Sequence, residues 1–315
     1  MKTDTGIPEP ELRPRVYQAA SFLSRSMPLS FTYWLGLRVA DVFYFRDRAG
    51  RGAVADNLRR ILAFRGIQPT DRMVRGQVRK TYQYFGKYLV DFFRFSMSHA
   101  DWLNGRVSTR HVERLESELR RGKGVIITTA HLGNWEVGGC VLAARGYPLT
   151  AVFRPFGIPH LDRMFTQYRK GRGMKLVPLG SSVRPLLNAL RAGECIVLLT
   201  DRNFTGQVRP MPFFGAPAPL PDGAARLAWK TGAPILPCYL TRRVDDSFLL
   251  SVDEAIRPED HASADSIERA VARSMESAIG EHPHQWFIFG RFWNESPPAA
   301  PGASAPGHPD TKTAP

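Results

Sequence analysis

The chain of 315 residues contains 43% hydrophobic and 23% charged residues, a balance typical of a globular protein that excludes a fully disordered chain. Its formal net charge of +14 favours an anionic partner, such as a nucleic acid, a membrane surface or a phosphorylated substrate. The three cysteines, Cys140, Cys195 and Cys238, form no CxxC pair, so neither a zinc ribbon nor a disulfide scaffold is expected.

The first 105 residues predict an N-terminal helical region. Residues 1–15 lack the apolar core of a signal peptide. The longest uncharged run within residues 17–45 is 26–37, which is shorter than the roughly 20 residues that cross a bilayer. Aromatic residues beside arginines in this segment predict a helix that lies on an anionic membrane surface. The alternative is a helix buried against the rest of the protein.

From about residue 106 short apolar runs alternate with helical patterns. This alternation predicts an α/β domain over residues 106–295, with a central mixed sheet flanked by helices. Residues 296–315 contain six prolines and predict a disordered tail. The expected strands are 125–130, 149–153, 195–199, 235–240 and 286–289, and the expected helices between them are 135–144, 161–169, 183–192 and 223–230.

A histidine at the end of a predicted strand is the first candidate for catalysis. His131 directly follows an apolar strand and precedes a predicted helix, and ligands bind at such strand ends in open α/β sheets. The His-x4-acid spacing alone is weak, because His111 and Glu116 repeat it in a charged helix. If Gly133 breaks the path, Glu136 can hold one ring nitrogen of His131 and leave the other free as a general base. The alternative is a histidine that only caps the helix.

Competing catalytic motifs are missing from the sequence. There is no G-x-S-x-G, no P-loop, and no G-x-G-x-x-G after a predicted strand. No second histidine or cysteine near His131 supports a metal site, so no metal is expected. These observations favour base catalysis without a protein nucleophile.

Several ordered blocks resemble those of the bacterial lipid A biosynthesis (lauroyl/myristoyl) acyltransferases, a family that includes phosphatidylinositol mannoside acyltransferases. The resemblance covers residues 17–292 and implies a glycerolipid acyltransferase-like fold with a membrane-associating N-terminal region. Asn203 departs from it, because both branches of the family carry a carboxylate there. The matching blocks are 122–127 with 131–136, 152–155, 168–169 with 173–179, 201–203, 212–215 and 221–234.

The resemblance implies transfer of a fatty acyl chain from a thioester to a hydroxyl of a membrane glycolipid similar to a lipid A precursor. The donor would be acyl carrier protein or coenzyme A, no other cofactor is expected, and the enzyme would work at the cytoplasmic face of the inner membrane. His131 would deprotonate the hydroxyl while Glu136 stabilises the imidazolium, an effect worth about 10²–10⁴-fold. Backbone N–H groups near Gly133 are candidate donors to the oxyanion.

Further residues are expected to bind substrate. By its position in the resemblance, Arg169 would bind an acceptor phosphate or sugar, since guanidinium groups bind anions bidentately. Arg154 and Arg202 are further candidates, the alternative being surface arginines. Asp201 would orient a site arginine or a substrate hydroxyl. Three more candidates each have a structural alternative: Asn134 polarises substrate or caps a helix, and Phe213 and Phe214 line an acyl groove or belong to the core.

Other readings stay open. The acceptor can be a phosphatidylinositol mannoside or a lysophospholipid. From other classes, a nucleic-acid-binding protein would explain the charge, but the arginines are spread along the chain and no nucleic-acid-binding motif is visible. A membrane-surface protein without activity is a further alternative. The mechanism requires a His131 ring open to a cleft and a Glu136 that does not turn toward another neighbour.

Overall fold

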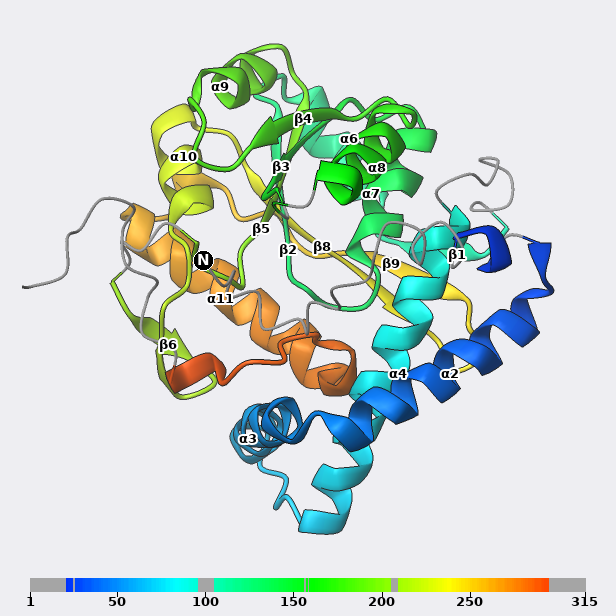
Figure 1. The fold of residues 1–315 in the computed structure, drawn as a ribbon. Helices are drawn as coiled ribbons and strands as arrows, with labels where there is room; N and C mark the ends of the chain where they lie inside the picture. Colours follow the sequence, from blue (N-terminus) through cyan, green and yellow to red (C-terminus); the bar gives the residue numbers. More distant parts are fainter. Residues whose placement is uncertain are drawn as a thin grey trace, which may run out of the picture.

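The computed structural model describes residues 21–24, 26–95, 105–155, 157, 159–204 and 209–294. Its centre is a seven-stranded sheet in the order β1-β9-β8-β2-β5-β3-β4, with helices on both faces (Figure 1). Within this sheet, as far as the structure describes it, neighbouring strands pair in parallel except for β8 and β9, which are antiparallel. The strands are β1 (Val107–Arg110), β2 (Val125–Thr129), β3 (Leu149–Phe153), β4 (Lys175–Pro178), β5 (Cys195–Leu199), β8 (Ile235–Arg242) and β9 (Phe248–Val252), with a separate hairpin of β6 (Met211–Phe213) and β7 (Ala216–Ala218).

Both faces of the central strands are buried, which explains their continuous apolar sequence. Ile126 of β2 packs in a cluster with α10 and α11, whereas its neighbours Val125 and Ile127 pack in a second cluster with α7. The described helices of this part are α6 (Glu113–Arg120), α7 (Trp135–Ala144), α8 (Pro159–Lys170), α9 (Arg184–Arg191), α10 (Gly223–Thr231) and α11 (Ala264–Glu281), with the 3₁₀ turns η1 (Pro258–Asp260), η2 (Pro283–Gln285) and η3 (Phe292–Asn294).

The N-terminal part is helical, as predicted, with α2 (Leu29–Arg46), α3 (Arg48–Phe64) and α4 (Asp71–Phe95). Helices α2 and α4 cross closely where two glycines meet, because a Cβ atom on Gly86 would lie 2.8 Å from the carbonyl oxygen of Gly36. A third apolar cluster joins α3 and α4 to Phe287 and Phe289 near the C-terminus. These helices therefore share a core with the α/β part.

The α/β class with a central mixed sheet is confirmed, and one predicted strand is wrong. Residues 286–289 form no strand; Trp286 makes a single antiparallel bridge with Leu132 after η2. Five of the described strands were not predicted, namely β1, β4 and β9 and the two strands of the short hairpin, β6 and β7. Among the described residues no helix is both long and apolar enough to cross a bilayer. The predicted tail, 296–315, lies outside the described residues.

Candidate active site

The site is built where neighbouring parallel strands end, at what we call the carboxyl edge of the sheet. Strands β2 and β5 pair in register, with Thr129 opposite Leu199. His131 and Asp201 each lie two residues beyond these positions. The ring Nδ1 of His131 lies 2.8 Å from Oδ1 of Asp201, so the two side chains form a hydrogen-bonded pair. The strand register thus brings together residues 70 positions apart in the sequence.

Asp201 is an ionised, fully buried acceptor. Its Oδ2 accepts the backbone N–H of His131 and the indole N–H of Trp286, each at 2.8 Å. Burial alone would raise the pKa of Asp201, but the His131 ring and these hydrogen bonds outweigh it and lower that pKa below its ordinary value. Because the carboxylate can only accept, Nδ1 of His131 donates and Nε2 carries the free lone pair. The His131 side chain is 17% exposed, so solvent reaches it.

The expected pairing of His131 with Glu136 is wrong. Glu136 instead accepts two hydrogen bonds from Arg169, at 3.1 Å from Nε and 2.5 Å from Nη2. Helix α7 begins at Trp135, so Glu136 lies in its first turn and turns away from the histidine toward α8. The mechanism expected from the sequence required Glu136 to bond no neighbour other than His131, and the structure does not meet this requirement. Asp201 supplies the orienting carboxylate instead. The expectation that Asp201 orients a site arginine or a substrate hydroxyl is also wrong, because its buried oxygens bond His131 and Trp286.

Arg169 is held in a buried ion pair. Its side chain is 11% exposed and that of Glu136 is 9% exposed. Burial acts to lower the pKa of Arg169, but the charge of Glu136 and its hydrogen bonds raise it. The guanidinium also lies 5.5 Å from the ring centroid of Phe165. The pair connects α8 to α7, and a role for Arg169 in binding the acceptor stays a prediction.

The segment 131–134, called the His131 loop below, is fixed along its backbone. The carbonyl oxygen of His131 accepts from the N–H of Phe287 at 2.8 Å, and the N–H of Gly133 donates to Gln285 at 2.9 Å. Gly133 has a φ of +62°, and a Cβ atom there would lie 1.9 Å from the carbonyl oxygen of Leu240. The N–H of Gly133 is therefore occupied. Of the expected oxyanion donors near Gly133, the first N–H groups of α7, beginning at Trp135, stay candidates.

Asn134 is a helix cap. Its side-chain oxygen accepts from the N–H of Val137 at 3.3 Å, and the residue is 1% exposed. The structural alternative is thus confirmed, and burial excludes the expected contact with substrate. Trp135, to which the sequence assigned no role in the site, makes a T-shaped ring contact with His131, with centroids 5.0 Å apart. The Trp135 ring also stacks on that of Tyr88, with centroids 4.7 Å apart.

Arg154 and Arg202 come together at the carboxyl edge. Arg154 follows β3 directly, and Arg202 is the residue after Asp201. Their guanidinium carbons lie 4.6 Å and 5.3 Å from the ring centroid of Phe204, so both cations pack against the same aromatic ring. Phe204 was not predicted; its place two residues after Arg202, beyond a strand end, is the only sequence signal for it.

The predicted acyl-groove residues belong to the core. Phe213 is 0% exposed and Phe214 is 2% exposed, and both pack in one cluster with Trp286. A groove lined by them is therefore wrong, and the core alternative is confirmed. Within the ranges described, no group of three His, Cys, Asp or Glu side chains could hold a metal ion.

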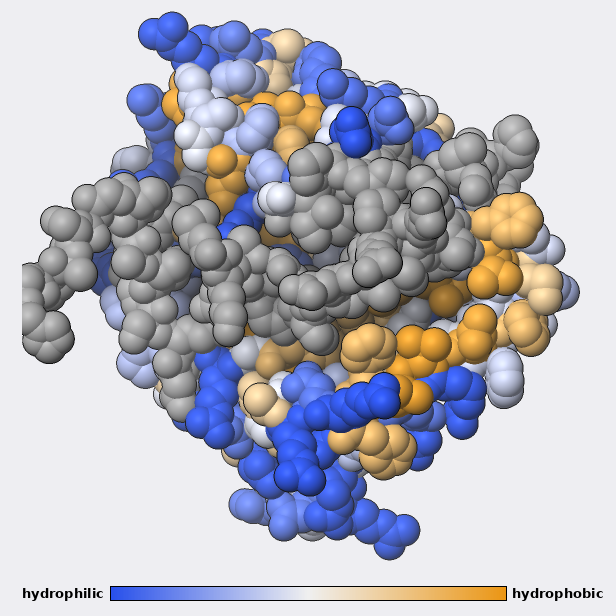
Figure 2. All heavy atoms as spheres, viewed as in Figure 1, coloured by the Kyte–Doolittle hydropathy of each residue, from blue (hydrophilic) through white to orange (hydrophobic). Residues whose placement is uncertain are grey.

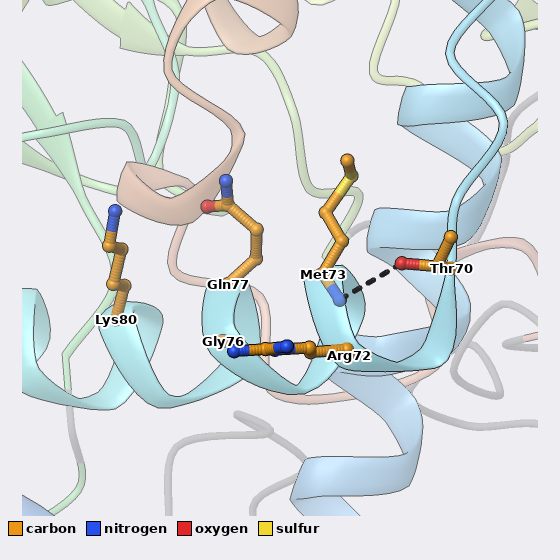
Figure 3. A pocket seen from close by; sticks show the side chains of 6 residues that line it. All are labelled: Thr70, Arg72, Met73, Gly76, Gln77 and Lys80. Atoms are coloured by element: carbon orange, nitrogen blue, oxygen red, sulfur yellow. Dashed lines mark hydrogen bonds between the residues drawn. The ribbon is translucent and has the colours of Figure 1, made fainter.

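Two surface pockets are lined by residues other than those of the carboxyl edge. One, of about 380 Å³, lies along the first turns of α4 (Figure 3). Its lining consists of Thr70, Arg72, Met73, Gly76, Gln77 and Lys80. The other, of about 490 Å³, lies between α10 and α11 beside Glu268. His131 lines neither pocket.

A comparison with known families identifies the family of this chain. Residues 14–295 match the family described as bacterial lipid A biosynthesis acyltransferase, and the chain belongs to this family. The family description and the names of its relatives are those of acyltransferases, and the chain is an O-acyltransferase.

Three curated relatives show which proteins of the family this chain resembles in sequence. The chain is 28% identical over 265 residues to a phosphatidylinositol mannoside acyltransferase of Mycobacterium tuberculosis, covering 79% of each chain. It is 26% identical to the protein of the same name from Mycolicibacterium smegmatis, covering 88% of this chain and 90% of that one. It is 23% identical to a lipid A biosynthesis acyltransferase of Haemophilus influenzae, covering 61% and 59%.

A solved structure gives a weaker likeness. It is the 1-acyl-sn-glycerophosphate acyltransferase PlsC of Thermotoga maritima, with a TM-score of 0.37 and 14% identity, covering 86% of this chain and 99% of that one.

Proposed function

We propose that the chain moves a fatty acyl group from an acyl thioester to a hydroxyl of a membrane glycolipid, with His131 as the general base. The observation that carries the proposal is the pair of His131 and Asp201. Asp201 occupies Nδ1 and leaves Nε2 as the lone proton acceptor, on a ring that solvent reaches. A hydroxyl is a weak nucleophile at neutral pH, so a positioned base is what this reaction needs.

The proposed step balances without a covalent enzyme intermediate. Nε2 of His131 takes the hydroxyl proton while the oxygen attacks the thioester carbonyl. The imidazolium that forms lies beside the carboxylate of Asp201, which stabilises its charge. The tetrahedral intermediate then expels the thiolate, and the imidazolium gives the hydroxyl proton to this thiolate. The products are an ester and a free thiol, carried by coenzyme A or by acyl carrier protein.

Arg154 and Arg202 are the side chains we assign to an anionic part of the substrates. Both lie at the carboxyl edge around Phe204, and Arg202 directly follows the residue that holds His131. Arg154 forms no ion pair with a carboxylate of the described residues. Guanidinium groups bind phosphate bidentately, and both the thioester donor and many lipid headgroups carry phosphate.

For the acceptor, a phosphatidylinositol mannoside is the first candidate and a lipid A precursor the second. The relatives named for the mannoside align over 79% to 88% of this chain, whereas those named for lipid A align over 58% to 61%. A lysophospholipid is the third candidate to compare.

The test is acyl transfer by the purified chain. Palmitoyl-coenzyme A and palmitoyl-acyl carrier protein are each offered with each acceptor, and the products are identified by mass spectrometry. We expect an acylated glycolipid, and we expect His131→Ala to reduce its rate by about 10²–10⁴-fold without loss of the fold. A His131→Ala variant with the wild-type rate would contradict the mechanism, and acylation of lysophospholipid alone would contradict the glycolipid acceptor.

The surface of α2 supports association with an anionic membrane, and we propose its cytoplasmic face as the side that is bound. Figure 2 shows apolar surface gathered over this helix. Arg38 and Arg46 lie exposed within it, and aromatic side chains beside cations suit the interface of a bilayer. The exposed apolar residues, called the α2 stripe, are Phe31, Trp34, Val39, Val42, Phe43 and Phe45.

Sedimentation with phosphatidylglycerol vesicles tests the α2 stripe. We expect the double variant Trp34→Ser and Phe45→Ser to remain in the supernatant while the unmodified chain sediments. Trp229→Ser is the matched control, because Trp229 is 49% exposed but lies on α10. Equal sedimentation of all three proteins would remove this role of α2.

A further inference from the structure

A buried ionic network joins the N-terminal helices to the His131 loop. Asp91 of α4 is 0% exposed and accepts hydrogen bonds from three other parts of the chain. The hydroxyl of Tyr33 on α2 donates to its Oδ1 at 2.6 Å. Its Oδ2 accepts from the side-chain amide of Asn134 at 3.1 Å and from a guanidinium nitrogen of Arg242 at the end of β8.

Stability alone does not explain why these charged groups are buried. An unpaired buried carboxylate is costly, and apolar residues of similar volume are often at least as stable as a buried ion pair. Arg242 is also buried, with a side chain 3% exposed, and donates to the Tyr33 hydroxyl at 3.0 Å. Because each bond has a required direction, the network fixes one relative placement of α2, α4, β8 and the cap of α7.

One route from Asp91 to the catalytic residues runs through Asn134. Asp91 holds the amide nitrogen of Asn134, while the amide oxygen holds the N–H of Val137. Both ends of this side chain are therefore fixed, and with them the first turn of α7. That turn carries Trp135, whose ring contacts the edge of His131.

A second route runs through Arg242. Its backbone N–H and carbonyl each bond the side chain of Gln285 at 2.8 Å. The carbonyl oxygen of Gln285 accepts the N–H of Gly133 at 2.9 Å. The network therefore contacts the His131 loop at two residues, Asn134 directly and Gly133 through Gln285.

We propose that Asp91 is a positioning residue for catalysis, which acts through Asn134 to set the place of Trp135 against His131. The inference rests on the proposed role of His131 as the base. The inference gives α4, an N-terminal helix, a role in catalysis. The spacing of His131 and Glu136 in the sequence does not reveal this role.

The central variant is Asn134→Ser. Serine still accepts the N–H of Val137 as a helix cap but offers no amide to Asp91, so the cap and the contact with Asp91 are separated. We expect kcat to fall about tenfold or more, since small misplacements of reacting groups cost up to about 10²-fold, while KM changes less than about twofold. The pH profile of kcat should also shift, because the surroundings of His131 change.

Asp91→Asn is the second variant, and Arg79→Met is its matched control. Arg79 lies about three turns earlier on α4 and joins this helix to Asp41 of α2 by an ion pair of 2.9 Å, away from Asp91 and Asn134. Both variants should lower Tm, whereas only Asp91→Asn should lower kcat. In the Asn134→Ser background the effect of Asp91→Asn on kcat should shrink to the part that runs through Arg242 and Gln285.

Three outcomes would overturn the inference: a wild-type kcat and pH profile for Asn134→Ser, a full additional loss of kcat from Asp91→Asn in that background, or an equal loss of kcat in Arg79→Met. If Asp91→Asn does not fold, Asn134→Ser alone decides. Failure of the proposed function is distinguishable, because it would appear as an active His131→Ala.

Discussion

Two buried carboxylates lie near the same histidine and serve different partners. Asp201 extends from the end of β5, is fully buried, and holds His131 across paired strands. Glu136 lies on α7, and its two hydrogen bonds go to Arg169 on α8. The pairing of β2 and β5 fixes Asp201 against His131, whereas the ion pair of Glu136 and Arg169 fixes α7 to α8. Proximity in sequence therefore did not identify the partner of His131.

Asp201→Asn should break the first pair with the largest effect. An amide no longer favours the tautomer with Nδ1 protonated, nor does it stabilise the imidazolium, so we expect kcat to fall by about 10²–10⁴-fold. Steady-state kinetics with the preferred donor and acceptor would measure it, and circular dichroism would verify the fold. A loss below about threefold would mean that Asp201 only supports the loop.

Glu136→Gln should break the second pair with a larger effect on stability than on chemistry. The change leaves Arg169 buried without its charge partner, and breaking a buried pair costs about 3–5 kcal/mol. We expect a clear drop in Tm and a loss of kcat below about tenfold. Thermal unfolding and kinetics on the same preparation separate the two. If kcat fell as far as in Asp201→Asn, Glu136 would belong with the catalytic pair after all.

Glu268 is another buried carboxylate, and it sharpens the comparison because it forms no ion pair with a cation of the described residues. Burial, followed by the charge of Asp222, raises its pKa to about 7, with Asp265 adding to the rise and Arg209 and Arg226 opposing it. The unfolded chain ionises this group near pH 4.5, so the folded state loses stability as the pH rises from about 4.5 to 7.

Glu268→Gln should therefore be the mildest of these changes, silent in kcat and visible only in stability. At pH 8 the variant should be more stable by on the order of 3 kcal/mol, and at pH 4 the two proteins should unfold alike. Denaturant unfolding at both pH values would measure the difference. An equal gain at both pH values would show that packing, not the charge, is responsible.

The sequence predicted what depends on local pattern and missed what depends on strand order. The apolar run before His131 and the glycine after it correctly indicated a strand end, and the N-terminal helices were recognised by their spacing. The partner of His131 depends on β5 lying beside β2, a non-local pairing that the sequence of either strand does not specify. Residues 286–289 look like a strand, but tertiary burial explains their apolar character, since Trp286 closes over Asp201.

Gly133 shows how little room the backbone leaves at this place. Even the methyl group of alanine would collide with the peptide of Leu240, and a positive φ of 62° adds strain for any side chain. A substitution there would push the end of β8 outward and, with it, Arg242. Libraries that vary residues 132–135 to alter selectivity should therefore keep this position fixed, because a single hydrogen atom in place of a side chain lets the loop and the strand touch.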